Sequence, residues 1–462
     1  MANAAWIASS YPEALAFRAG LHRVEEVQRE ILLRIVRRNR DTPFGREHDF
    51  ASIRSVEDYV ARVPLRTYED FAPYIEANAL TAEPIEHFEP TSGSTGATKL
   101  IPYTRSLRTE VARAIATWIV STFRAEPRAF SGPAYWSLSP VGVGPRETAN
   151  GIRIGFDGDD EYVGKFRGAL VRAVQAVPSS VRLIADIDAF RRTTLAHLLR
   201  SHSLSLISVW HPSFLLLLLG DEQPEWPNLR TISCWTDAGA APAAAELAKR
   251  FPHVRIEPKG LLSTEGVVSI PIGAAAPALA YRSHFVELME VGTGFSRSGR
   301  AEARPYVREI VLTTGGGLYR YQTGDLVEIV GYAGSCPLLR FLGRKRVVDH
   351  FGEKLNEVFV RDCFTRTLPP HRFAMLALDG DHYTLFIDAD APVDVARLED
   401  ALRESFHYDY CRRLGQLGAL DVLRVREADY FAAMTGEQRL GDIKPPAVDA
   451  RRDWRERFTP RL

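Results

Sequence analysis

The 462-residue sequence has few cysteines and no excess of charge. Lys and Arg number 58, as do Asp and Glu, so the formal net charge is zero. The chain therefore lacks the basic character of proteins that bind nucleic acid or anionic membranes, and neither partner is expected. The four cysteines, none in a Cys-x-x-Cys pair, are Cys234, Cys336, Cys363 and Cys411. This spacing argues against a disulfide scaffold and a zinc site, and predicts a reduced, cytoplasmic location.

Long uninterrupted hydrophobic runs are also lacking. The longest apolar stretch, residues 204–219, is interrupted by His211, Pro212 and several serines. It predicts a buried strand, a turn and a core helix, not a membrane span. The N-terminus shows no charged-then-apolar pattern of a signal sequence.

The chain has 45% hydrophobic residues, enough for a sizeable core and for two or more domains. From about residue 130, short apolar runs alternate with helical segments such as 242–250. This alternation is typical of a parallel sheet with crossover helices. The expected strands are 135–139, 204–210, 229–235 and 254–257.

A different pattern follows between residues 280 and 342, where closely spaced strands joined by glycine turns predict a smaller antiparallel sheet or barrel. These strands are expected at 309–313, 318–321, 326–330 and 338–342. Past residue 344 a compact α+β unit is expected. Its elements are helices at 353–368 and 393–406, a hairpin of 372–378 and 382–389, and a strand at 420–425. We expect residues 1–344 to form a large N-terminal domain and residues 345–462 a small C-terminal domain.

Residues 91–99 hold two glycines, five hydroxyl side chains and one lysine, a composition suited to wrapping a polyphosphate. A helix with apolar residues at regular spacing is expected over 103–123. The segment is not a Walker loop, because the second glycine of that motif would fall at Thr98 and Leu100 follows the lysine. Kinases and P-loop ATPases are therefore disfavoured.

The segment 91–99 resembles the phosphate loop of the adenylate-forming ANL superfamily, with Thr98 in place of proline. Four further segments resemble superfamily landmarks in the same order: 236–241, 260–266, 319–325 and 341–344. The ordered set is more specific than any one of its parts.

The closer resemblance is to the Gretchen Hagen three family of acyl acid–amido synthetases, also known as auxin-responsive promoter proteins. It rests on three further stretches: 63–75, 351–357, and 408–422 with 444–446. The loop keeps the broader superfamily form, and residues 441–443 replace the Asn-Gln-Tyr that precedes the C-terminal lysine in plant members. These departures argue against plant-hormone substrates.

The resemblance implies an ANL-type α/β adenylating fold, with mixed sheets, a β-barrel-like part and a small mobile α+β C-terminal domain. The hinge would be Lys345 and Arg346. The implied cofactors are ATP and Mg²⁺. The residues implied at the ATP phosphates are Ser92, Gly93, Ser94, Thr95, Gly96 and Lys99.

The other landmarks imply further roles around the nucleotide. Glu265 would ligate Mg²⁺ and Thr264 would donate to the α-phosphate. Asp325 would accept from the ribose hydroxyls. Gly239 and Ala240 would leave room for adenine. Arg344 would lie near the ribose or phosphate, and Lys444 would bridge the carboxylate and the α-phosphate.

The acyl pocket is expected between the helix after the loop and the sheet edges. Its candidate residues are Ile115, Trp118, Ile119, Trp136 and Leu138, although ordinary core packing explains them equally well. His211, at a strand-to-helix turn, is either a residue of the acceptor channel or a structural histidine.

The function that the resemblance implies is an ATP-dependent acyl acid–amido synthetase. It would form an acyl adenylate, release pyrophosphate, and transfer the acyl group to an amine or amino acid. The alternatives are an acyl-CoA ligase or carrier-protein loader and, from another class, a non-catalytic nucleotide-binding protein. The expected partners are small molecules, and the expected state is a monomer or weak homodimer.

Overall fold

The computed structural model places most of the chain in defined elements. It describes residues 1–90, 99–138, 146–148, 151–155, 164–184, 186–274, 276–290, 307–344, 347–348, 353, 355–413, 417–434, 445–449 and 451–458. Within these residues, no helix is long and apolar enough to cross a membrane.

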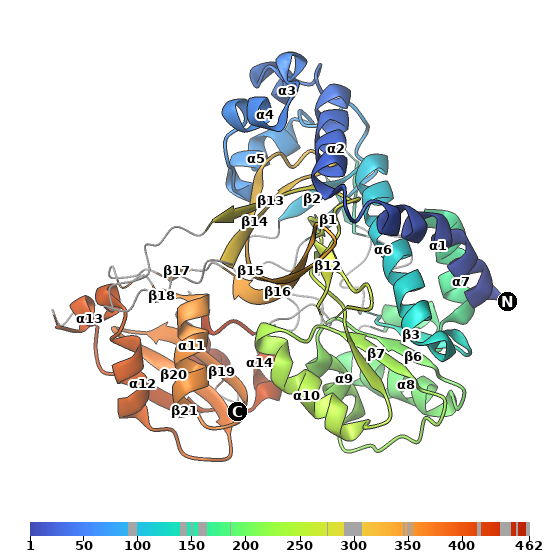
Figure 1. The fold of residues 1–462 in the computed structure, drawn as a ribbon. Helices are drawn as coiled ribbons and strands as arrows, with labels where there is room; N and C mark the ends of the chain where they lie inside the picture. Colours follow the sequence, from blue (N-terminus) through green and yellow to red (C-terminus); the bar gives the residue numbers. More distant parts are fainter. Residues whose placement is uncertain are drawn as a thin grey trace.

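The N-terminal part is helical, and two of its helices begin at capping residues that can be recognised in the sequence. Its helices are α1 (Ala2–Ala19), α2 (Val24–Arg38), α3 (Pro43–Glu47), α4 (Val56–Arg62) and α5 (Tyr68–Glu76). Capping boxes, in which a hydroxyl and an acid satisfy free N–H groups, begin α4 at Ser55 and α5 at Thr67. Helices α2 to α5 gather above the central strands in Figure 1.

The segment 91–99 connects two antiparallel strands, β1 (His87–Pro90) and β2 (Leu100–Tyr103). Two short strands, β5 (Arg153–Ile154) and β4 (Arg146–Glu147), complete a sheet in the order β2-β1-β5-β4. Helix α6 (Arg105–Ala125) follows, with Thr104 as its N-cap. The helix predicted over 103–123 is therefore confirmed.

The predicted parallel sheet is present. Its strands are β3 (Ala134–Trp136), β6 (Leu206–Ser208), β7 (Thr231–Cys234) and β8 (Arg255–Pro258), all parallel in the order β3-β6-β7-β8. The helices around it are α7 (Gly164–Val174), α8 (Ile187–Arg200), α9 (Pro212–Leu219) and α10 (Ala241–Arg250). The stretch 204–219 thus forms the strand, turn and helix that its sequence predicts.

The central sheet is antiparallel, in the order β11-β12-β16-β15-β14-β13. Its strands are β11 (Ser269–Ile270), β12 (Ala278–Leu279), β13 (Phe285–Glu290), β14 (Val307–Thr313), β15 (Tyr321–Ala333) and β16 (Cys336–Arg344). A small hairpin, β9 (Leu262–Ser263) with β10 (Gly266–Val267), lies before it in the chain. Of the two predicted forms, an antiparallel sheet or a barrel, the described pairings give the sheet.

The strand predicted at 318–321 is wrong. Leu318 and Tyr319 are fully buried, but they lie in the turn that precedes β15. Gly317 and Arg320 have positive φ angles of 94° and 49°, which strand geometry does not allow. These residues are apolar because they are buried, and not because they form a strand.

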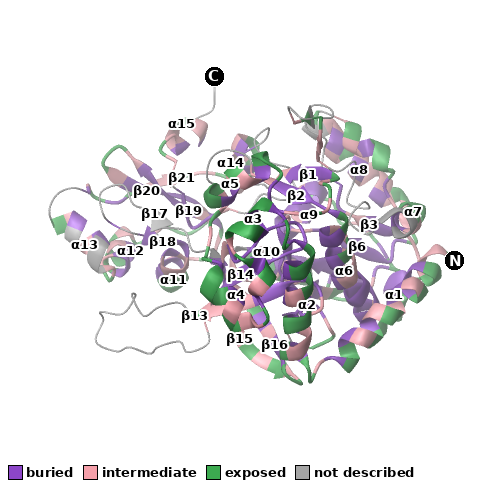
Figure 2. Cartoon of the chain, turned by 90° about the horizontal axis from the view of Figure 1, so that it is seen from above, coloured by how far each residue is buried: buried purple, intermediate pink, exposed green. Residues whose placement is uncertain are grey.

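The C-terminal part has a sheet in the order β21-β20-β19-β22 and its own hydrophobic clusters. Its strands are β17 (Val347–Val348), β18 (Leu355–Asn356), β19 (His371–Asp379), β20 (His382–Ala389), β21 (Asp421–Arg424) and β22 (Val448–Asp449). Its helices are α11 (Glu357–Thr367), α12 (Val395–Leu402), α13 (Phe406–Arg413), α14 (Glu427–Met434) and α15 (Trp454–Phe458). In Figure 2 the buried residues of this part lie apart from those around α6 and β6.

The hairpin predicted around Gly380 is confirmed as β19 and β20. Two predicted helices differ from the structure. The helix expected at 353–368 begins only at Glu357, because Leu355 and Asn356 pair with β17. The helix expected over 393–406 is interrupted, and α12 and α13 replace it.

Candidate active site

Of the residues predicted to bind the ATP phosphates, the structure describes Lys99. Lys99 lies next to β2, with its Nζ 3.9 Å from Glu69 Oε1 and 5.3 Å from the centre of the Tyr68 ring. The Tyr68 hydroxyl accepts a hydrogen bond from the Leu100 N–H at 2.7 Å and thereby fixes the backbone beside the lysine. The predicted residues Ser92, Gly93, Ser94, Thr95 and Gly96 lie outside the described residues.

Thr264 and Glu265 form the turn between β9 and β10. The Tyr103 hydroxyl donates to the Thr264 carbonyl oxygen at 2.9 Å, and the Tyr321 hydroxyl donates to Glu265 Oε1 at 3.4 Å. Tyr103 is the last residue of β2, the strand that follows the segment 91–99 in sequence, and Tyr321 is the first residue of β15. Two tyrosines therefore fix the Thr-Glu turn: Tyr103 from the strand after the segment 91–99, and Tyr321 from the landmark segment 319–325.

Asp325 is buried in β15, with 1% of its surface exposed. Gly324, with φ of 73°, allows the bend before it, and the Asp325 N–H donates to Thr323 Oγ1 at 3.0 Å. In the ladder between β15 and β16, Asp325 stands opposite Arg344. The structure thus brings together two of the residues predicted near the ribose.

A pocket of about 860 Å³, including its solvent-open part, lies where the parallel sheet, the central sheet and the C-terminal part meet. It is lined by His211, Trp235, Thr236, Asp237, Ala238, Ala240, Pro258, Gly260, Leu261, Ser269, Pro277, Val327, Leu339, Phe341, Gly343, Glu357, Arg361, Pro445 and Pro446. Of the predicted residues, Ala240 and His211 are in this lining. Gly239 lies in the same short helical turn, 238–240, where Ala238 has a positive φ of 49°.

His211 is the N-cap of α9, and its imidazole satisfies the start of that helix. Its Nδ1 accepts from the Ser213 N–H at 3.2 Å and lies 2.6 Å from Ser213 Oγ. His211 therefore has the structural role that was one of its two predicted alternatives. Because the same side chain lines the pocket, a role in the acceptor channel stays a prediction.

Three charged residues of the pocket were not predicted as site residues. Asp237 Oδ2 accepts from the Phe341 N–H at 3.1 Å, and burial raises the pKa of the Asp237 carboxyl. Glu357 and Arg361, one turn apart on α11, pair at 2.6 Å. The position of Asp237 just beyond the carboxyl end of the parallel strand β7 was a usable signal, since ligands of α/β sheets bind at that edge.

The acyl-pocket candidates lie in packed regions. Ile115, Trp118 and Ile119 are on α6, and the Trp118 and Trp136 rings are 5.8 Å apart. All five candidates belong to, or pack against, hydrophobic clusters of the N-terminal part, and none lines the pocket described above. Their role in binding an acid stays a prediction. The hinge residues Lys345 and Arg346, and Lys444, lie outside the described residues.

The fold is that of the ANL adenylating enzymes. A solved GH3.15 acyl acid amido synthetase resembles it with a TM-score of 0.76, covering 96% of this chain and 95% of that chain at 16% identity. A solved 2-hydroxyisobutyryl-CoA ligase resembles it with a TM-score of 0.55, covering 94% of this chain and 90% of that chain at 14% identity. At these identities the likeness concerns the fold alone.

Two family models place the chain more narrowly. The GH3 family N-terminal domain matches residues 16–221, and the GH3 family central domain matches residues 305–344. Together they match more than half of the sequence. The chain belongs to the GH3 family, as its motifs predicted.

Curated relatives match over shorter stretches. A probable indole-3-acetic acid-amido synthetase of Oryza sativa subsp. japonica is 29% identical over 180 residues, covering 34% of this chain and 37% of that protein. An indole-3-acetic acid-amido synthetase of Arabidopsis thaliana is 35% identical over 157 residues, covering 29% of this chain and 25% of that protein. The matched part is thus about a third or less of each relative's length.

Proposed function

We propose that the protein is an ATP-dependent acyl acid–amido synthetase. The observation that carries the proposal is the meeting of three landmark segments: Lys99 beside β2, the Thr264–Glu265 turn, and Asp325 in β15. The tyrosine hydrogen bonds from Tyr103 and Tyr321 join them. This is the donor, acceptor and charge set that nucleotide activation of a carboxylate needs.

The proposed reaction has two steps. A carboxylate oxygen of the acid attacks the α-phosphorus of ATP, and the bond from that phosphorus to the pyrophosphate oxygen breaks. An amine then attacks the acyl carbon and loses a proton, and AMP leaves with the bonding electrons. Lys99 would hold the phosphates, Thr264 would donate to the α-phosphate, and Asp325 would accept from the ribose hydroxyls.

We propose Mg²⁺ as the metal, held by Glu265 together with phosphate oxygens. Mg²⁺ in nucleotide sites commonly uses one or two carboxylates plus substrate phosphates, and Glu265 supplies one carboxylate, 7% exposed. Within the described residues there is no cluster of three or more His, Cys, Asp or Glu side chains for a metal. A bound Mg²⁺ would neutralise charge that develops on the leaving pyrophosphate.

We further propose two domains, 1–344 and 345–462, that turn about Lys345 and Arg346 between the two steps, with Lys444 entering for adenylation. The mixed lining of the pocket supports this division, because Glu357, Arg361 and the two prolines come from the C-terminal part. A thioester-forming ligase is the second candidate, because it would share the adenylation step and differ only in using a thiol in place of the amine. We propose a cytoplasmic location and small-molecule partners only.

An acid-by-acceptor matrix tests the function. Purified protein, ATP and Mg²⁺ are combined with a panel of carboxylic acids, including indole-3-acetic acid, and with amino acids, amines or coenzyme A. AMP release and product mass are measured. We expect an amide, and loss of AMP release in Asp325→Ala with folding retained. A thioester in place of an amide would select the second candidate. Absence of acid-dependent pyrophosphate exchange across the panel would reject both.

A further inference from the structure

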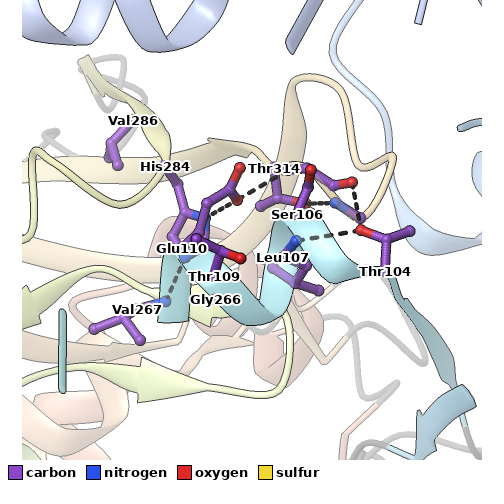
Figure 3. Close-up of polar contacts among 12 residues, drawn as sticks. Thr104, Ser106, Leu107, Thr109, Glu110, Gly266, Val267, His284, Val286 and Thr314 are labelled. Atoms are coloured by element: carbon purple, nitrogen blue, oxygen red, sulfur yellow. Dashed lines mark hydrogen bonds and ion pairs between the residues drawn. The ribbon is translucent and has the colours of Figure 1, made fainter. Parts of the chain in front are cut away.

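Glu110 and His284 form a buried acid–imidazole pair that none of the roles above uses. Glu110 lies on α6 and is 6% exposed, and His284, directly before β13, is 0% exposed. His284 Nδ1 is 2.8 Å from Glu110 Oε2, across 174 residues of sequence. Figure 3 shows the two side chains facing each other between α6 and the neighbouring strands.

The hydrogen bonds around the pair define where its proton lies. The Val267 N–H donates to His284 Nε2 at 3.0 Å, so Nε2 carries no hydrogen. Nδ1 therefore carries the proton and donates to Glu110. The Gly315 N–H donates to the same carboxylate oxygen at 2.9 Å. A neutral imidazole and a carboxylate thus complete one chain of hydrogen bonds, from Val267 to Gly315.

These hydrogen bonds connect the three segments that carry the nucleotide motifs. Helix α6 directly follows the 91–99 loop and β2, and Val267 lies two residues after Glu265. Gly315 lies in the turn that leads into β15 and Asp325. Thr104, the N-cap of α6, also donates to the Gly315 carbonyl at 2.8 Å. The Glu110–His284 pair therefore contacts all three segments through hydrogen bonds.

Close packing at the pair explains two glycines. A Cβ added at Gly266 would lie 2.9 Å from His284 Nε2, and one at Gly315 would lie 2.6 Å from Glu110 Oε1. Neither position accommodates a side chain while the pair stays in place. Gly266 ends the Ser-Thr-Glu-Gly landmark, so the pair gives that landmark's glycine a physical reason.

We propose that Glu110 and His284 are positioning residues for ATP, which hold the Thr264–Glu265 turn and the β14–β15 turn in register with α6. The proposal rests on the proposed function, because it concerns the same nucleotide site. Neither side chain touches the nucleotide in this assignment. Their effect comes through the placement of Thr264 and Glu265, to which nucleotide affinity is sensitive within fractions of an ångström.

The test is MgATP binding to the full-length protein, measured by isothermal titration calorimetry with unfolding followed in parallel. In His284→Leu the ring donor and acceptor are both lost, and we expect Kd to rise roughly tenfold, the effect of losing about one buried hydrogen bond in placement. In His284→Gln the amide oxygen accepts from the Val267 N–H and the amide nitrogen donates to Glu110. We expect this variant to restore Kd to within about twofold of the wild type.

Glu110→Leu removes the acceptor side of the pair. The His284 Nδ1–H and the Gly315 N–H both donate to one Glu110 oxygen, and leucine has no acceptor for either, so we expect weaker MgATP binding here too. The control is Glu399→Gln in the C-terminal part, whose carboxylate accepts from Tyr408 and Arg412 away from these segments. It should lose stability without changing Kd.

The outcomes separate the two proposals. A wild-type protein that does not bind MgATP would reject the proposed function and this inference with it. A wild-type protein that binds, with His284→Leu and Glu110→Leu binding equally well, would reject the positioning role alone. If Glu399→Gln weakened MgATP binding as much as His284→Leu does for a similar loss of stability, the effect would be general destabilisation, and the positioning role would fall.

Discussion

Glu427, the first residue of α14, is a carboxyl whose ionisation opposes folding. Its N–H donates to Asp388 Oδ2 at 2.8 Å. Burial, and then the nearby charge of Asp388, raise the pKa of the Glu427 carboxyl from its ordinary 4.5 to about 7. The folded state therefore holds this proton more tightly than the unfolded state. The stability that follows is fully present below pH 4.5 and is lost as the pH rises through about 7.

We therefore expect the free energy of unfolding to fall between about pH 5 and about pH 8, and to fall less in Glu427→Gln, which has no proton to lose. Urea unfolding at several pH values, with fluorescence as the signal, measures this. Parallel pH dependences in the two proteins would contradict the assignment.

At the residue scale, the sequence allows candidate site residues to be predicted when they belong to motifs that occur in a known order. Glu265 and Asp325 were predicted because their segments follow the loop in the family's order, and the structure brings these segments together around Tyr103 and Tyr321. The sequence did not indicate Glu110 and His284, because a hydrogen bond across 174 residues leaves no local pattern. Single buried acids and histidines become informative only when their partners are known.

At the scale of elements, α9 has an unusual N-cap, a histidine where Ser, Thr, Asp or Asn is common. Its imidazole accepts from the Ser213 N–H at 3.2 Å, and Pro212 fits the first turn because it needs no N–H partner. We expect His211→Ala to lower the free energy of unfolding by about 1 kcal/mol and His211→Asn to restore most of that loss. Denaturant unfolding of the three proteins measures the difference. An alanine variant as stable as the wild type would show that the cap contributes nothing.

Elements with strong periodicity were predictable, and segments whose conformation is set by a backbone turn or by strand pairing were not. The parallel strands β3, β6, β7 and β8 followed from apolar runs between helices. The residues at 318–321 are equally apolar, but Gly317 and Arg320 turn the backbone there. Leu355 and Asn356 look like the start of a helix in the sequence, yet they pair with β17, Val347–Val348, because strand pairing overrides local helix propensity.

On the scale of the whole molecule, the segment 445–448 is held against α11 beside the pocket by hydrogen bonds. The Glu357 carboxylate accepts from the Ala447 N–H at 2.6 Å and the Val448 N–H at 3.4 Å. Arg361 pairs with Glu357 and donates to the Pro445 carbonyl at 3.0 Å. On its other side the segment pairs with β19 through β22. The residues that directly follow Lys444 are thus held on two sides.

This arrangement predicts that Glu357 and Lys444 act as one unit. If Lys444 bridges the carboxylate and the α-phosphate, Glu357→Ala frees the segment after it and lowers the rate of acid-dependent pyrophosphate exchange, as Lys444→Ala does. Because both changes then remove the same contribution, the double variant should be little slower than the slower single variant. MgATP affinity should change little. Asp421→Asn, which breaks the exposed pair with Arg455 at 2.6 Å, is the matched control and should leave the exchange rate unchanged. Multiplicative losses in the double variant would show that Glu357 acts independently of Lys444.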